Sequence, residues 1–152
     1  MIARTTREIL DQARYFHRQL HAFYEALKEK IEQPKLHMIL DYLGQHEQRM
    51  ETALKRYEED ISRKMADTWF KFTPAQTVDE ALREITVAPD ASLDDLMAIA
   101  IRLENYFVAL YRSAADQAVS AEVKEVFDQL LKETIRERLK LTRDLVDMHD
   151  FM

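Results

Sequence analysis

The chain has 152 residues, of which 47% are hydrophobic and 33% are charged, and these proportions are typical of a soluble globular domain. It contains no cysteine, which excludes disulfide bonds, a thiol nucleophile and cysteine-ligated metal sites. The net charge of −6 argues against a nucleic-acid partner, and no apolar run approaches the roughly 20 residues that a membrane span requires. The polar N-terminal segment lacks the pattern of a signal peptide, so we expect a cytoplasmic protein.

The first helix is expected over residues 6–32. Thr5-Thr6-Arg7-Glu8 forms a capping box at its start, and Pro34 disfavours helical backbone at the residue before it. Pro34 itself suits the first turn of a second helix, which is expected over residues 34–64. The short connection between these helices predicts an antiparallel hairpin.

The second helix carries an apolar stripe at helical spacing that is interrupted by Glu47. A carboxylate that faces a helical core is costly unless it is paired, protonated or bound to a cation. Gly44 lies in the same helix; either it permits close packing of a neighbour or it is simply tolerated. The stripe consists of Leu36, Leu40, Leu43, Met50, Leu54, Tyr57 and Ile61.

Residues 65–92 break the helical periodicity and are expected to cross over along the bundle. A second capping box, from Thr77 to Glu80, predicts a short helix that ends near Ile85. The aromatic residues between Trp69 and Phe72 either pack on the side of the bundle or form a patch for a homodimer.

Two further helices are expected over residues 93–117 and 121–148, the first of them capped by Ser92. One glycine and three prolines provide little turn chemistry for a β-protein, so the composition also indicates an all-α fold. The predicted architecture is a single domain over residues 1–152. It is a four-helix bundle made of two helical hairpins joined by a long crossover.

Each of the four helices has a polar residue near its middle, where the stripe should be apolar. At about 1.5 Å per residue, these residues lie at similar depths when they are counted from the two hairpin turns. They form either a hydrogen-bonded network, in which protons or arginine side chains balance the carboxylates, or a divalent metal site. The predicted ligands are His17, Glu47, Glu104 and Glu137, with Met50 and Thr134 beside them. The other histidines are expected to lie off this seam: His21, His37 and His46.

At these residues the chain resembles the ferritin-like superfamily, and rubrerythrin-like proteins most closely. The resemblance implies iron or another divalent metal, with a Glu from the first helix of each hairpin and a Glu-x-x-His from the second. His17 and Glu104 stand at the first-helix positions. The second-helix motifs read Glu47-Gln48-Arg49-Met50 and Thr134-Ile135-Arg136-Glu137, so the metal motif is incomplete.

Two functions follow from this partial match. The first is a binding or interaction protein without catalysis, in which the buried acids form a hydrogen-bonded network. The alternative is a metal-binding oxidoreductase with ferroxidase- or peroxidase-like activity, in which the altered His/Glu site holds the metal. In that case Tyr24 and Tyr111 are expected to orient the carboxylates. The expected partner is a second copy of the chain, with neither nucleic acid nor membrane.

Overall fold

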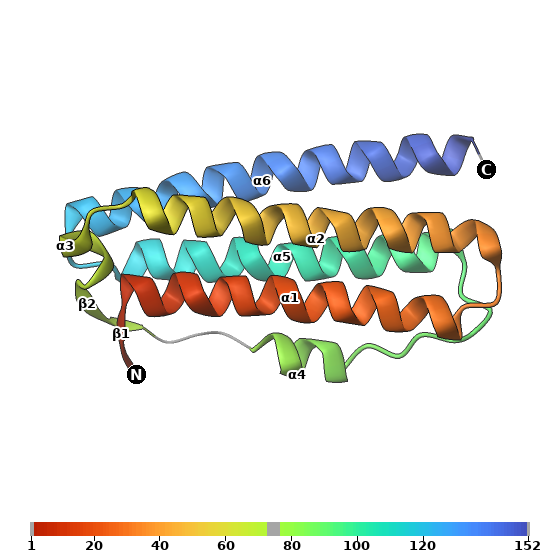
Figure 1. Cartoon of the computed structure of the whole chain (residues 1–152), viewed down its shortest axis with the longest axis horizontal. Helices are drawn as coiled ribbons and strands as arrows, with labels where there is room; N and C mark the ends of the chain where they lie inside the picture. The colour runs from red at the N-terminus through yellow and green to blue at the C-terminus, as the bar shows by residue number, and fades with distance from the viewer. Residues whose placement is uncertain (1, 73–76, 152) are drawn as a thin grey trace.

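The computed structural model describes residues 2–72 and 77–151, and its four long helices lie side by side (Figure 1). Helix α1 forms one antiparallel hairpin with α2, and α5 forms the other with α6. The predicted all-α four-helix bundle is therefore confirmed. Two helices end earlier than expected, α1 by two residues and α2 by four, whereas α6 continues for two residues longer. The helices are α1 (Thr6–Lys30), α2 (Pro34–Asp60), α5 (Leu93–Gln117) and α6 (Ala121–Asp150).

The predicted caps begin these helices by satisfying backbone N–H groups that have no partner within the helix. The Thr5 hydroxyl accepts a hydrogen bond from the Glu8 N–H at 3.1 Å. Ser92 and Asp95 form a reciprocal capping box at the start of α5. At the α1–α2 turn, His37 Nε2 donates to the carbonyl of Ile31 at 2.9 Å, so His37 has a structural role.

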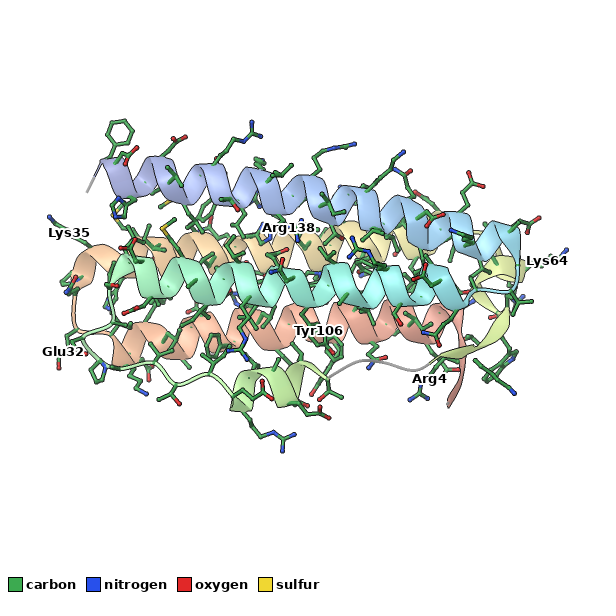
Figure 2. The ribbon with its side chains drawn as sticks, turned by 180° about the vertical axis from the view of Figure 1, so that it is seen from behind. Arg4, Glu32, Lys35, Lys64, Tyr106 and Arg138 are labelled. Atoms are coloured by element: carbon green, nitrogen blue, oxygen red, sulfur yellow. The ribbon has the colours of Figure 1, made fainter. Side chains whose placement is uncertain are left out.

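The connection between the hairpins runs along the length of the bundle (Figure 1). It contains α3 (Arg63–Ala66), β2 (Trp69–Phe72) and the predicted short helix α4 (Val78–Arg83), which Thr77 caps. The connection brings the Pro89 carbonyl to the Glu32 N–H, at the α1–α2 turn. Figure 2 shows Glu32 and Lys35 at this end of the bundle and Lys64 at the other.

A short antiparallel ribbon joins the N-terminus to this connection. Strand β1 (Ile2–Thr5) pairs with β2 so that Ile2 lies opposite Phe72 and Thr5 lies opposite Trp69. The sequence did not predict this ribbon. Trp69 is 62% exposed, so the expectation that it packs on the bundle is wrong. The side chains of Phe70 and Phe72 lie outside the described part of the structure.

The direction of the helices decides which residues lie next to one another. Because the connection returns to the end where α2 begins, α2 and α5 run in the same direction (Figure 1). A residue that follows Glu47 in α2 is therefore displaced along the bundle in the same direction as one that follows Glu104 in α5.

Within the described residues, no helix is both long enough and apolar enough to cross a membrane.

Candidate metal centre

Four buried polar side chains meet near the middle of the bundle. His17 comes from α1, His46 and Glu47 come from α2, and Glu104 comes from α5. None of them is more than 2% exposed. Their polar atoms must therefore find partners within the protein or in a bound ion, because water does not reach them.

The four side chains form two hydrogen-bonded pairs. His17 Nδ1 is bonded to Glu47 Oε2, and His46 Nε2 donates to Glu104 Oε1 at 2.8 Å. The imidazole of His17 also stacks on the ring of Phe107. Each carboxyl group is thus held by one histidine, in an arrangement that fixes the orientation of both acids.

The protonation states follow from burial and from these pairs. Burial lowers the pKa of His17 to about 3, so its imidazole is neutral at physiological pH. Burial and the charge of Glu104 raise the pKa of Glu47 well above its usual value, which favours the protonated acid. Burial would also raise the pKa of Glu104 and lower that of His46. Burial is the largest single cause for both groups, but the hydrogen bond between Glu104 and His46 and the charges around them together outweigh it, so the pKa of Glu104 is lowered and that of His46 is raised. Without a metal ion, Glu104 is therefore a carboxylate and His46 an imidazolium, while Glu47 and His17 are neutral. The net charge of the four groups is then zero.

One oxygen of this group has no conventional donor. Glu104 Oε2 is fully buried, and no N–H or hydroxyl group of the described residues reaches it. The neighbouring acid is Glu47, which interacts with Glu104 directly. Either the proton of Glu47 or a cation between the two carboxyl groups can satisfy this oxygen.

Three of these side chains are close enough to hold one metal ion. His46, Glu47 and Glu104 each offer a ligand atom, and these atoms all lie within 4.8 Å of one another. Imidazole and carboxylate groups together suit iron, manganese and zinc. A divalent cation would also neutralise the two carboxylates. The donor set and the unpaired Glu104 Oε2 therefore fit a single divalent metal ion.

The structure brings three of the four predicted ligands together. His17, Glu47 and Glu104 are neighbours, whereas Glu137 is half-buried on α6 and does not belong to the close group of ligand atoms. The buried residue of α6 at this level is Thr134, which is 4% exposed. The sequence placed Glu137 on the buried stripe of α6, but it lies at the edge of that stripe.

The expectation that His46 lies off the seam is wrong, because α2 contacts more than one neighbour. Successive residues of a helix are separated by about 100°, so Glu47 reaches His17 on α1 while His46 reaches Glu104 on α5. One signal in the sequence could have found His46. His46 lies seven residues, or about two turns, after the apolar Ile39, so the two residues share one face of the helix. The structure buries Ile39 completely.

Gly44 lets α1 approach α2 beside this group. A Cβ atom at position 44 would lie 3.2 Å from His21 Nδ1. That same nitrogen is hydrogen-bonded to the Gly44 carbonyl oxygen at 3.1 Å. Close packing is therefore the role of Gly44, and His21 has a structural role between the helices.

Tyr111 does not orient a carboxylate as expected. Its side chain is 2% exposed, and its hydroxyl has no hydrogen-bond partner among the residues that the structure describes. Burial is the main cause that raises the pKa of this phenol, and the charges of Glu104, Glu133 and Glu47 raise it further. The hydroxyl therefore stays protonated and able to donate.

Comparison with solved structures identifies the architecture. The chain aligns over 97% of its length with 96% of a Thermotoga maritima protein, with a TM-score of 0.59. The crystal structure of that protein, at 2.30 Å resolution, is described as that of a ferritin-like diiron-carboxylate protein. This chain has the ferritin-like fold. The two sequences are 17% identical, a level at which the comparison establishes the fold alone. No protein-family model and no curated protein sequence matches the chain.

Proposed function

We propose that this ferritin-like protein binds one divalent transition-metal ion in the core of the bundle, with His46, Glu47 and Glu104 as ligands. The unpaired Glu104 Oε2 carries the proposal, because it lies beside a second buried acid and within reach of a histidine. An ion among these groups would replace the protons of Glu47 and His46 with a charge that both carboxylates share.

His17 acts on the metal site through Glu47. Its hydrogen bond to Glu47 Oε2 fixes the orientation of that carboxylate, and its stacking on Phe107 fixes the orientation of the imidazole. The complete burial of all four groups excludes bulk water from the ion. A bound iron or manganese ion would supply one-electron redox chemistry at this position.

The proposal is for one ion rather than two. The neighbour's description as a diiron-carboxylate protein makes iron the first metal to test. Dinuclear carboxylate sites in such bundles draw on four Glu and two His residues. Here Met50 and Thr134 stand in the Glu-x-x-His motifs, and Glu137 lies outside the close ligand group. A likeness to rubrerythrins in particular, and a homodimer, stay predictions.

A second candidate is a binding or interaction protein without a metal. It is favoured by the charge balance of the buried group, which reaches neutrality with two protons and no ion. In that case the acids and histidines hold the two hairpins together. This candidate predicts that the purified protein contains no bound metal.

Metal analysis of the purified protein separates the two candidates. Cells are grown with added iron, manganese and zinc, and the protein is then analysed by mass spectrometry and titrated calorimetrically with each metal. The expected result is one equivalent of metal per chain, which Glu104→Gln abolishes.

Glu137→Gln is the matched control, because it removes an acid of the same helical bundle from outside the ligand group. It is expected to keep the metal. The metal site is refuted if the protein binds none of the three ions, or if Glu104→Gln and Glu137→Gln lose metal equally.

A further inference from the structure

The outward face of α6 carries a row of cations. In both views of the molecule α6 runs along one edge of the bundle, so no other described helix lies over this face (Figures 1 and 2). The row lies roughly opposite Leu141 and Leu145, which are buried in the core. Its four members are all exposed and recur at helical spacing, and we call them the cationic stripe: Lys132, Arg136, Lys140 and Arg143.

The cationic stripe places like charges next to one another. Its first three members stand four residues apart, and the last follows three residues later. Like charges at these spacings destabilise a helix. At the start of the same helix, by contrast, Lys124 pairs with Asp128 at 2.8 Å. The stripe residues form no such ion pair with the described part of the chain. An anionic partner would therefore relieve a repulsion that the folded chain leaves in place.

The cationic stripe is short and has acids beyond both ends. From Lys132 to Arg143 it covers about 16 Å of the helix axis. Glu125 lies seven residues before Lys132, and Asp150 lies seven residues after Arg143, so both acids are on the same face. A nucleic-acid strand or an anionic membrane extends past this length, and the acids would repel it there. A short acidic segment fits the stripe better.

An exposed aliphatic edge accompanies the cations. Leu139 lies between Arg136 and Lys140 and is 60% exposed, and Val146, seven residues later, is 44% exposed. Burying these side chains against another apolar group would be favourable, whereas a row of phosphates offers no apolar group. Carboxylates and apolar side chains occur together on an amphipathic acidic helix, which can dock by its apolar positions.

A second copy of the chain does not provide this complement through the same face. If two α6 helices paired about the middle of the cationic stripe, the cations of one copy would face those of the other. The repulsion at the centre would oppose the contact. The charges therefore favour a different protein as the occupant.

We propose that the cationic stripe is the docking site for an acidic amphipathic helix of another protein. Carboxylates of that helix lie opposite the four cations, and one of its apolar side chains packs on Leu139. The docking site does not involve the metal centre, so it can fail or succeed independently of the metal proposal.

The test measures binding of a synthetic peptide to the purified protein by fluorescence anisotropy. The labelled peptide has about 20 residues, which is long enough to form a helix. It carries glutamates at the spacing of the cationic stripe and a leucine on the same face. A second peptide has the same composition, but its glutamates are spread around the helix. The patterned peptide is expected to bind about ten times more tightly than the second one, and added salt should weaken its binding.

Matched variants locate the binding surface. Arg136→Glu is expected to weaken binding of the patterned peptide about three- to tenfold, whereas Lys30→Glu makes the same charge change at an exposed position of α1 and should have no effect. Leu139→Ser is expected to weaken binding about three- to tenfold. Its control is Val119→Ser, which alters a residue that is 88% exposed between α5 and α6. If Arg136→Glu does not fold, Arg143→Glu tests the same stripe.

Other occupants give different results in the same assay. The proposal is overturned if the two peptides bind equally, or if single-stranded DNA or vesicles of anionic lipid bind as tightly as the patterned peptide and Leu139→Ser leaves all affinities unchanged. It is also overturned if light scattering shows a dimer that Arg136→Glu dissociates, because a second copy would then cover the stripe.

Discussion

The imidazole of His17 lies flat on the phenyl ring of Phe107, with ring centroids 3.9 Å apart and ring planes 3° from parallel. His17 belongs to α1 and Phe107 to α5, so this contact joins the two hairpins at the level of the buried acids. The aromatic surface on one side of the imidazole contributes to the burial that keeps His17 neutral.

Phe107→Leu tests this contact. Because the substitution removes the stacked ring and leaves a poorer fit, it should lower the free energy of unfolding by about 1–2 kcal/mol. Urea denaturation followed by circular dichroism measures the change. A loss of less than about 0.5 kcal/mol would show that the stacking contributes little to the docking of the hairpins.

Glu104→Gln tests the buried ion pair in the absence of metal. The imidazolium of His46 loses its charged partner, so the metal-free protein should lose about 1–3 kcal/mol of stability. Glu137→Gln should change the free energy of unfolding by less than about 0.5 kcal/mol, because Glu137 lies outside the cluster. Equal losses in the two variants would contradict the assignment of the buried pair.

Gly44→Ala tests the close approach of α1 and α2. Alanine favours a helix by about 1 kcal/mol relative to glycine, but here the new methyl group would meet His21 Nδ1 at 3.2 Å. We expect the full gain only in a His21→Ala background and a smaller gain, or a loss, with His21 present. A double-mutant cycle measured by thermal unfolding checks this coupling, and strict additivity would contradict it.

Glu58 predicts a pH dependence of stability that does not involve the metal centre. Burial and the neighbouring Asp11 raise its pKa to about 7, although Arg14 opposes the rise. In the unfolded chain its pKa is about 4.5, so the folded protein holds this proton more tightly. The contribution of this group to stability is complete below pH 4.5 and is lost as the pH rises through about 7.

Glu58→Gln should remove this dependence. Denaturation curves at intervals between pH 5 and pH 8 are expected to show a fall in stability for the parent protein and a flatter profile for the variant. Glu59→Gln, at an exposed position of the same helix, is the matched control and should retain the parent profile. A parent profile that rises with pH over this range would contradict the assignment.

Local signals explain why the long helices could be predicted from the sequence. Stripes at helical spacing and caps such as Ser92 with Asp95 act within one or two turns, and the structure retains them. Both buried acids of the described residues, Glu47 and Glu104, could be found because a carboxylate on an apolar stripe is conspicuous. These features require no knowledge of how the helices are arranged.

The missed features depend on contacts between distant parts of the chain. His46 is buried because α2 contacts α5 as well as α1, and the stripe of a single helix does not show how many neighbours it has. The β ribbon pairs Ile2 with Phe72, which lie far apart in the sequence, and each strand has only four residues. A small pocket lined by Met50, Tyr111 and Thr134 is formed by three helices, so it is visible only in the assembled bundle.

The β ribbon constrains the half of the molecule that contains the first hairpin, α1 and α2, more than the half that contains the second, α5 and α6. It joins the two ends of the segment from Ile2 to Phe72, so the first hairpin is closed at both ends, by the α1–α2 turn and by the strand pair. The free end of the second hairpin has no strand pair among the described residues: an exposed ion pair between His149 and Asp94 links α6 to α5 there, and the exposed Phe151 follows the end of α6. Amide protons near the end of α6 should therefore exchange first with solvent. His17 and Glu47 belong to the closed half and Glu104 to the other, so the complete group of acids and histidines assembles only when the halves dock.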